Sequence, residues 1–570
     1  MEFGGNKMEL KEQFVLSTFN KIRAGVSRDQ LTEYVVSGIY MYLCKKNCLF
    51  GGEEEKIAYD IVNSQNKEFA PELEELLSQV DNETIYELIK YTIKNSDVKF
   101  DDSSSEELCE LTMKLFGDLY GGPIIFDACS GRGTFLYNAI EYSLKKRFVF
   151  KELIGTDINY QNVQISNMLL KCMRYLKGLE SNQVVNVANS MTDNFNFPIT
   201  HAYVFPPLGL KFAMKERYNK SKLFNDIEFT GRNTAEWIFI DNVLAQNNGS
   251  SNSRTIAIVS LRALFNEDDK EFRNRLIESG RLEGIIELPS GGLNSSGIKL
   301  GMLIFGHNNK EVKILDASEF VIKNKKQFRS EIDVERIYDA YMASTCNKYD
   351  SKELINLRNL LPSNIGIGEI EIDNGVELGE MAEVFTGSQY TLRNFEDVFS
   401  KEPTGYRILT SSDIDNGLVD WKKLQSIKYE DTKFDKFAVK KGDVVVTSKS
   451  SKVKTVVVDI EPKEKILVTG GMIIVRPDLA KLNPTYLKMF LDSNLGQTSL
   501  KQIQKGVTII TINSKDLKNI LVPMVNIEEQ NKKAENFNLK LTTIMSYKRE
   551  IEKLERSLLN AFENDEGGNH

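Results

Sequence analysis

The sequence predicts a multidomain protein that joins an all-helical start, a doubly wound α/β domain and a β-rich final part with a long terminal helix. Three observations predict this class. Apolar residues recur every three or four positions up to about residue 94, short apolar strands then alternate with helices, and glycine-containing short strands follow from Gly375. A chain of 570 residues is also too long for one hydrophobic core and should form several domains.

Composition narrows the class of protein further. Hydrophobic residues make up 41% of the chain and charged residues 27%, as in ordinary globular proteins. No apolar run approaches the roughly 20 residues that span a bilayer, and Met1–Leu10 lacks the pattern of a secretory signal, so we expect a cytoplasmic protein. The 6 cysteines form no CxxC pair and there are only 3 histidines, so we expect reduced thiols and no metal site. A net charge of −8 means that any DNA contact must come from local basic surface.

Residues 1–100 are expected to form the N-terminal helical domain. Val15, Phe19 and Ile22 begin a helical repeat of apolar positions that continues through the following segments. The Asp- and Ser-rich stretch Asn95–Ser105 is expected to be a linker.

Residues 101–315 alternate between strand and helix patterns, which predicts a doubly wound, mostly parallel sheet. The expected strands are Pro123–Ala128, Glu152–Thr156, Val184–Ala188, Ala202–Phe205, Arg254–Ser260, Leu282–Leu288 and Lys299–Gly306. The expected helices are Thr134–Lys146, Tyr160–Leu176, Thr234–Ala245 and Glu271–Ser279. Residues 316–372 are expected to be a mixed connector.

Residues 373–526 are expected to form a β-rich domain, and residues 527–570 a spacer helix and tail. Apolar residues one heptad apart favour a coiled-coil seam over a lone surface helix. They are Phe537, Ile544, Ile551 and Leu558, with Tyr547, Leu554 and Ala561 on the adjoining row.

A glycine turn after the first expected strand is a candidate nucleotide-binding loop. Gly131 and Gly133 would let the backbone approach a ligand, and Asp127 begins this loop. A dinucleotide fingerprint would need a third glycine where Leu136 stands, so nicotinamide binding is disfavoured. Asp157 ends the next strand, where a carboxylate can accept ribose hydroxyls. The alternative is a plain glycine turn with Asp157 as a helix cap.

A second motif lies about seventy-five residues further on, where the strand at Ala202 runs into Phe205-Pro206-Pro207-Leu208. With the glycine loop, this turn resembles that of the modification (M) subunit of type I restriction systems, a family of N6-adenine DNA methyltransferases. The resemblance extends to Ala235–Phe239, Arg254–Ser260, Leu264–Phe265, Arg273–Leu276 and Ile285–Pro289, and to Arg28–Lys45 near the start.

This resemblance implies a class I S-adenosylmethionine-dependent methyltransferase fold. It implies that S-adenosylmethionine is bound by Asp127, Gly131, Gly133, Asp157 and Asn189. A flipped adenine would then lie at the Pro-Pro turn, where a side-chain carbonyl and a main-chain carbonyl accept the hydrogens of its N6 amino group.

Four positions depart from the family pattern. Phe205 stands where the family has Asn, Asp or Ser, and Leu208 replaces the aromatic residue that would stack on the base. Asn189 replaces the acid after the third strand, and Arg132 lies within a loop of usually small residues, where it could obstruct the cofactor. The catalytic turn Phe205, Pro206, Pro207 and Leu208 is therefore degenerate, although the carbonyl of Pro206 can still accept a hydrogen bond.

The C-terminal part resembles half of a type I specificity (S) subunit, with one target-recognition domain and one spacer helix. The matching segments are Gly375–Gly387, Tyr406–Leu409, Ser412–Ile414, Val439–Val445, Leu521–Pro523 and Glu528–Gln530. The basic loop with Lys449, Lys452 and Lys454, and the loop with Lys505, are candidate contacts to DNA phosphates. For the first loop a solvated hairpin tip is the alternative.

Two functions from different classes follow. The first is a site-specific DNA adenine-N6 methyltransferase of a restriction-modification or defence system, with double-stranded DNA as partner. The second is a catalytically impaired recognition subunit in a heteromer with an active methyltransferase. In both cases the terminal helix would pair with itself or a sister chain to read a two-part site, and a restriction subunit is a possible further partner. Methylation of RNA or protein is a third alternative, which the recognition half disfavours.

Overall fold

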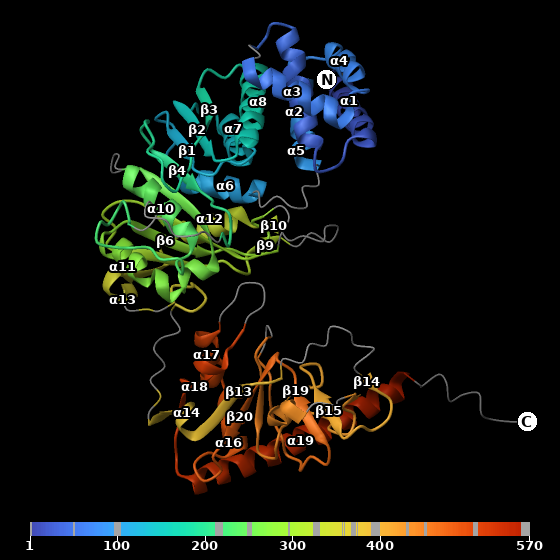
Figure 1. Cartoon of the computed structure of the whole chain (residues 1–570), viewed down its shortest axis with the longest axis vertical. Helices are drawn as coiled ribbons and strands as arrows, with labels where there is room; N and C mark the ends of the chain where they lie inside the picture. Colours follow the sequence, from blue (N-terminus) through green and yellow to red (C-terminus); the bar gives the residue numbers. More distant parts are fainter. Residues whose placement is uncertain are drawn as a thin grey trace, which may run out of the picture. The chain divides into compact units, whose positions relative to one another are not determined.

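The chain folds into two compact units, Met1–Gly366 and Ile367–His570, in this computed structural model (Figure 1). The structure describes residues 3–49, 52–95, 104–210, 220–247, 253–293, 297–322, 331–355, 357, 359–365, 372, 374–388, 399–415, 417–428, 432–449, 453–504 and 511–559. Each unit is described by itself. None of the helices in these ranges combines the length and apolar character that crossing a bilayer requires.

Unit 1 begins with five helices, as the apolar spacing predicted. They are α1 Phe3–Gly25, α2 Leu31–Lys45, α3 Gly52–Asn66, α4 Ala70–Ser78 and α5 Asn82–Asn95. Helix α2 is the centre of this helical module, because it packs against α3, α4 and α5, and most of its apolar residues are buried.

The expected linker is only partly described, and its described end belongs to the folded unit. Ser105 caps α6 (Glu106–Leu115) by accepting a hydrogen bond from the N–H of Leu108 at 3.2 Å. Ser104 beside it is 4% exposed. Residues 96–103 lie outside the described residues.

A nine-stranded mixed sheet forms the centre of unit 1, in the order β11-β8-β6-β7-β5-β4-β1-β2-β3. Its strands are β1 Ile124–Asp127, β2 Glu152–Asp157, β3 Asn182–Val187, β4 His201–Val204, β5 Arg254–Ser260, β6 Leu282–Glu287, β7 Leu300–Phe305, β8 Glu311–Asp316 and β11 Asn347–Asp350. Five pairings are parallel and three, those of β5 with β7, β6 with β7 and β8 with β11, are antiparallel. The prediction of a doubly wound, mostly parallel sheet is confirmed.

Both faces of the sheet are covered. On β1, Ile125 joins the core formed with α7 (Thr134–Lys146) and α8 (Tyr160–Lys177), whereas Phe126 on the opposite face contacts the ring of Phe195 at 4.6 Å. The remaining helices of this region include α10 Ala235–Gln246, α11 Lys270–Glu278, α12 Val334–Met342 and α13 Ser351–Ile355. Strand β1 is therefore buried along its whole length.

The stretch 316–372, expected to be a connector, contributes to this unit. Strand β11 forms the sheet edge beside β8, and α12 packs on α6. A short antiparallel pair also lies here, β9 Val321–Ile322 with β10 Glu331–Ile332.

Unit 2 is built on two four-stranded sheets, ordered β13-β20-β17-β18 and β14-β16-β15-β19, with a separate β12-β21 pair. The strands are β12 Gly375–Glu377, β13 Ala382–Thr386, β14 Phe399–Ser400, β15 Tyr406–Leu409, β16 Ser426–Ile427, β17 Val444–Thr447, β18 Thr455–Val457, β19 Lys465–Val468, β20 Met472–Pro477 and β21 Leu521–Pro523. The helices are α14 Leu378–Met381, α16 Pro484–Asp492, α17 Asn494–Ile503, α18 Ser514–Lys518 and α19 Ile527–Leu559. The β-rich character predicted for this part is confirmed.

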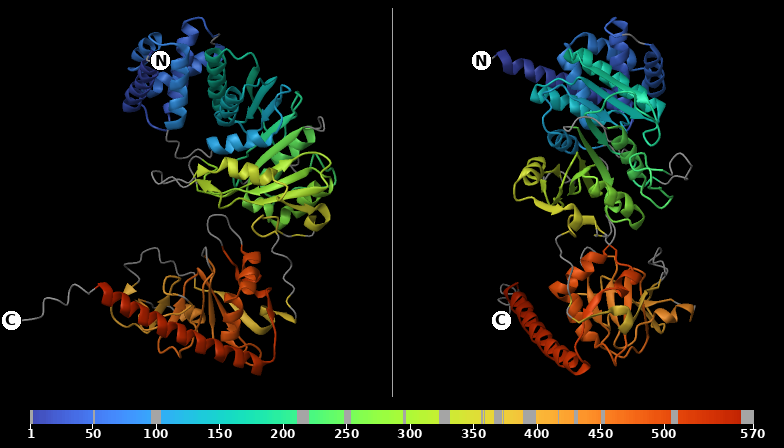
Figure 2. Two further views of the ribbon diagram at one scale, coloured as in Figure 1. Left: turned by 180° about the vertical axis from the view of Figure 1, so that it is seen from behind. Right: turned by 90° about the vertical axis from the view of Figure 1, so that its left-hand side faces the viewer.

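The long helix α19 lies along unit 2 and packs on α16 near its start (Figure 2). Gln530 is 0% exposed, and its side chain hydrogen-bonds the N–H of Asn483 and the carbonyl of Lys481. Further along, Ile544 is 51% and Ile551 54% exposed, so unit 2 itself leaves this apolar row open.

Candidate active site

The glycine loop and the Pro-Pro turn lie next to each other at the carboxyl edge of the sheet. Strand β1 pairs in parallel with β2 on one side and with β4 on the other. Asp127 is level with Tyr203, and the N–H of Ala128 donates to the carbonyl of Tyr203 at 3.0 Å. Two motifs far apart in the sequence are therefore brought together, at the edge where α/β sheets bind ligands.

Positive φ angles shape the glycine loop. Gly131 has φ +52 and Gly133 has φ +84. Residues with a Cβ adopt such positive φ angles only at a cost in conformational energy. A Cβ on Gly131 would meet no atom within 4 Å, whereas one on Gly133 would lie 3.1 Å from the hydroxyl of Ser166 in α8. Gly131 thus leaves space beside the loop, while at Gly133 the backbone angle and the packing against α8 both require glycine.

Asp157, the candidate ribose-binding acid, also holds the loop. Its Oδ2 accepts the N–H of Gly131 at 3.0 Å, and its Oδ1 accepts the N–H of Asn159 at 2.8 Å. A carboxylate has about four acceptor sites, so it can still accept a ligand hydroxyl. The cap of α8 is Asn159, whose side chain accepts the N–H of Gln161 and of Asn162, so Asp157 is not the residue that caps this helix.

Two exposed apolar residues beside Asp157 were missed by the sequence analysis. Ile158 is 71% exposed, and Val187, which pairs with Asp157 across the strands, is 52% exposed. Exposed apolar side chains next to a carboxylate can contact an aromatic ring of a ligand whose polar part binds that carboxylate. The signal in the sequence was only an apolar residue directly after the end of β2, Ile158, and one at the last position of β3, Val187.

Asp127 is buried beneath the loop, with 1% of its surface exposed. Burial raises the pKa of its carboxyl to about 8, with a further contribution from the charge of Asp157; the N–H of Cys129, which donates to it at 3.2 Å, acts in the opposite direction. Burial therefore favours the protonated, uncharged form of the Asp127 carboxyl.

Asn189 lies near the loop but stabilises its own turn. Its Oδ1 accepts the N–H of Met191 at 3.1 Å, and its N–H donates to Asp193 at 2.8 Å. Next to it, the hydroxyl of Ser190 lies 2.9 Å from that of Thr156, and both donate to the carbonyl of Ala128. These buried hydroxyls hold the ends of β1, β2 and β3 together under the glycine loop.

The Pro-Pro turn offers an apolar surface where the family has an acceptor. The ring of Phe205 lies 6.4 Å from that of Tyr203, at an angle of 65°. Phe205 and Leu208 pack against the unit 1 core, Pro206 is buried and Pro207 is exposed. None of the four side chains of the turn can accept a hydrogen bond, so only its main-chain carbonyls can do so.

Arg132 is directed towards the helical module. Its guanidinium forms an ion pair with Glu33 in α2, with 2.6 Å between Nη2 and Oε1. The sequence predicted that Arg132 could obstruct the cofactor; in the structure its guanidinium is held by the carboxylate of Glu33.

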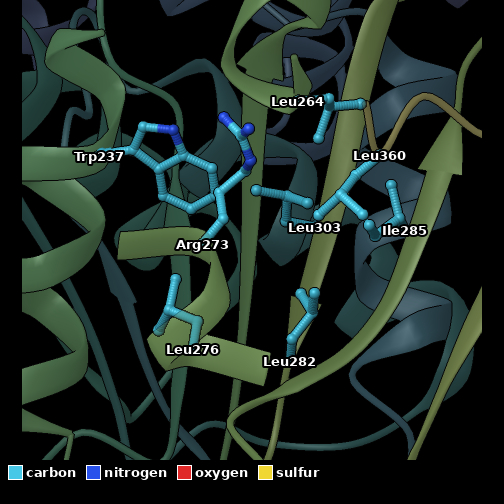
Figure 3. Close-up of a pocket in the computed structure, with 8 residues that line it drawn as sticks. All are labelled: Trp237, Leu264, Arg273, Leu276, Leu282, Ile285, Leu303 and Leu360. Carbon is cyan, nitrogen blue, oxygen red and sulfur yellow. The ribbon is translucent and has the colours of Figure 1, made fainter. Parts of the chain in front are cut away.

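A small apolar pocket elsewhere in unit 1 belongs to the core and not to this site (Figure 3). Leu264, Leu276 and Leu303 line it together with Trp237 and Arg273. The Arg273 guanidinium donates to the carbonyls of Ala263 and Asn266, at 3.1 and 2.7 Å. The pocket therefore presents no polar group in need of a ligand.

The candidate DNA contacts of unit 2 behave differently from one another. Lys449 is exposed, and its backbone bridges to Thr511, which brings the loops after β17 and before α18 together. The ammonium of Lys454 donates to the carbonyls of Ser411 and Ile414, at 3.2 and 2.8 Å, so it holds a neighbouring turn. The other two candidates, Lys452 and Lys505, lie outside the described residues.

The mixed sheet, with a glycine loop after β1 and an acid at the end of β2, defines the class: unit 1 has the fold of class I S-adenosylmethionine-dependent methyltransferases. Residues 104–358 match the N-6 DNA Methylase family, and residues 374–556 match the Type I restriction modification DNA specificity domain. The chain is thus an N-6 DNA methylase domain joined to a type I DNA specificity domain.

Individual relatives match parts of the chain. The specificity subunit of the type I restriction enzyme EcoBI from Escherichia coli is 34% identical over 129 residues, 22% of this chain and 26% of that protein. The chain therefore spans about a quarter of the length of this curated relative. A type I methyltransferase subunit from Streptococcus thermophilus covers 53% of this chain and 68% of its own, at 18% identity and a TM-score of 0.43. The type IIL enzyme MmeI, solved in complex with DNA, covers 89% of this chain and 83% of its own, at 11% identity and a TM-score of 0.47.

Proposed function

We propose that this protein is a site-specific DNA adenine-N6 methyltransferase of a restriction-modification or defence system. In this proposal unit 1 binds S-adenosylmethionine and receives a flipped adenine, and unit 2 reads double-stranded DNA. The observation that carries it is the pairing of β1 with β4, because it sets the glycine loop beside the Pro-Pro turn.

The residues at the loop fit S-adenosylmethionine. Asp157 retains acceptor capacity for ribose hydroxyls, and Ile158 and Val187 offer apolar surface beside it. Gly131 leaves open space, and the buried carboxyl of Asp127 lies below the loop. When bound, the cofactor supplies an electrophilic methyl group on a sulfonium.

The Pro-Pro turn would orient the adenine. The carbonyl of Pro206 can accept one hydrogen of the N6 amino group, which directs the nitrogen lone pair towards the methyl group. Phe205 cannot accept the second hydrogen, so water or a main-chain group must take it. A missing hydrogen-bonding group of this kind lowers the rate about 100- to 1,000-fold.

Unit 2 would supply the sequence specificity. A single recognition domain reads half of a two-part site, and pairing of two chains through the open row of α19 would supply the other half. Of the two described candidate lysines, Lys449 is the one whose side chain is exposed for a phosphate, since Lys454 donates to main-chain carbonyls.

The packing of Phe205 supports a second candidate function. Its ring fills space against Tyr203 and the core, which a catalytic acceptor would not do. The chain would then be a recognition subunit that works beside an active methyltransferase.

Transfer of labelled methyl from S-adenosylmethionine to genomic DNA of an unmodified host distinguishes the two. We expect slow incorporation by the unaltered chain, loss of it in Asp157→Ala, and an increase of about 100-fold in Phe205→Asn. Incorporation only after Phe205→Asn would mean an impaired enzyme. No incorporation by either form, with DNA binding retained, would favour the recognition subunit.

A further inference from the structure

An ion pair joins the cofactor loop to the helical module. Arg132 lies between the two loop glycines, and Glu33 in α2 is its partner at 2.6 Å. The side chain of Glu33 is 8% exposed and that of Arg132 is 36% exposed, so one end of the pair is well shielded from water. The pair links residues about a hundred positions apart in the sequence.

The backbone around Arg132 bears directly on the proposed cofactor site. On one side Gly131 donates its N–H to Asp157 and accepts the Ser166 hydroxyl at 3.0 Å on its carbonyl. On the other side Gly133, with φ +84, is the N-cap of α7. Arg132 is therefore one residue away from the N–H group that the Asp157 carboxylate accepts.

A second contact holds the other side of the site in the same way. Lys171 of α8 forms an ion pair with Glu54 in the first turn of α3, with 2.5 Å between Nζ and Oε1. The helical module therefore contacts both the glycine loop and α8, with an acid on the module side of each contact.

We propose that Arg132 is a positioning residue that couples the cofactor loop to the docking of the helical module through Glu33. The affinity of the loop for S-adenosylmethionine then depends on the position of α2 relative to the loop, and cofactor binding in turn stabilises that position. The effect on cofactor affinity rests on the proposed function. The effect of the Arg132–Glu33 ion pair on the mobility of the loop does not.

The first arm of the test uses the full-length protein without ligand. Amide hydrogen exchange of residues 128–134 is measured in the unaltered chain, in Arg132→Ala and in Glu33→Gln. We expect faster exchange of the loop in both variants. The matched control is Glu83→Gln, which breaks the Lys177–Glu83 pair between α8 and α5 (2.7 Å) away from the loop, and it should leave loop exchange unchanged.

The second arm measures the dissociation constants of S-adenosylmethionine and S-adenosylhomocysteine by calorimetry. We expect binding to be about 3- to 10-fold weaker in Arg132→Ala and in Glu33→Gln. The double variant should bind no more weakly than either single variant, because both changes remove the same interaction. Glu33→Gln keeps the shape of the side chain, so a folded variant is available if Arg132→Ala unfolds.

The outcomes separate the two proposals. Unchanged exchange and unchanged affinity in both variants would overturn the role of Arg132, as would equal losses in Glu83→Gln. Additive losses in the double variant would also overturn it. Faster loop exchange in a chain that binds neither compound would leave the restraint intact and refute the proposed cofactor.

Discussion

The hydroxyls of Ser104 and Tyr203 lie 2.6 Å apart in the buried interior of unit 1. Tyr203 is 2% exposed, and its ring stacks on Phe135 of α7 at 4.1 Å. Tyr203, two positions before the Pro-Pro turn, is thus held by its ring contact with α7 and by its hydrogen bond to the segment before α6. The turn is anchored by contacts outside its own motif.

We expect Ser104→Ala to lower the free energy of unfolding of unit 1 by about 1–3 kcal/mol, since it removes a buried hydrogen bond from the Tyr203 phenol. Combining it with Tyr203→Phe should cost less than the sum of the two single changes, because both remove the same bond. Urea unfolding followed by circular dichroism measures each value. Full additivity would mean that the two hydroxyls do not interact.

The pH dependence of stability should change in Asp127→Asn. The folded pKa of about 8 is raised from the ordinary 3.8, so the folded state retains a proton that the unfolded state loses. Stability from this group is therefore complete below about pH 4 and is lost as pH rises towards 8. The variant, which stays uncharged, should gain stability relative to the unaltered chain across that window.

The matched control for this change is Asp118→Asn, at an exposed position. Unfolding free energies at pH 5, 6, 7 and 8 give the comparison. A difference between Asp127→Asn and the unaltered chain that does not vary with pH would show that Asp127 is ionised in the folded protein.

Gly155→Ala should destabilise unit 1 by about 1–3 kcal/mol, the usual cost of adding a carbon to a packed core. An added Cβ would lie 2.9 Å from side-chain carbons of Leu136 and Ser130, so the glycine loop would have to move. Gly121→Ala, where no atom lies within 4 Å of the added carbon, is the control. Thermal unfolding of both variants provides the measurement.

Association of chains should depend on the open row of α19. We expect Ile544→Glu with Ile551→Glu to convert a dimer into a monomer in sedimentation velocity, because charged residues in a heptad seam oppose pairing. The control is Leu539→Glu, which changes a residue that is 68% exposed on the same helix but outside this row. It should not alter the oligomeric mass measured by sedimentation. A monomer in the unaltered chain would argue against pairing through this helix.

Much of the fold could be predicted because the spacing of apolar residues and the residues that begin or end an element indicate the same boundaries. The limits of α7 and β5 fall where the sequence placed them, since a glycine precedes α7 and apolar residues fill β5. The direction of β7 could not be predicted, because an apolar run is the same forwards and backwards. In the described part of the connection from β6 to β7 there is no crossover helix, so β7 runs antiparallel between β5 and β6.

The candidate site was predictable in its local motifs and not in its long-range partners. The order of the glycine loop, Asp157 and the Pro-Pro turn was legible from the sequence alone. Ser104 was missed, because an Asp- and Ser-rich run is typical of a linker. Arg132 was interpreted without its partner, because nothing in the sequence relates it to Glu33.

The setting of Cys129 in the cofactor loop has a consequence for chemical durability. Burial, with Asp127 and Asp157 nearby, raises the pKa of this thiol well above its ordinary value. Oxidants and alkylating agents attack the thiolate and not the thiol. The Cys129 thiol is therefore held in its less reactive protonated form, and peroxide should oxidise it more slowly than the low-pKa thiols of redox-active proteins.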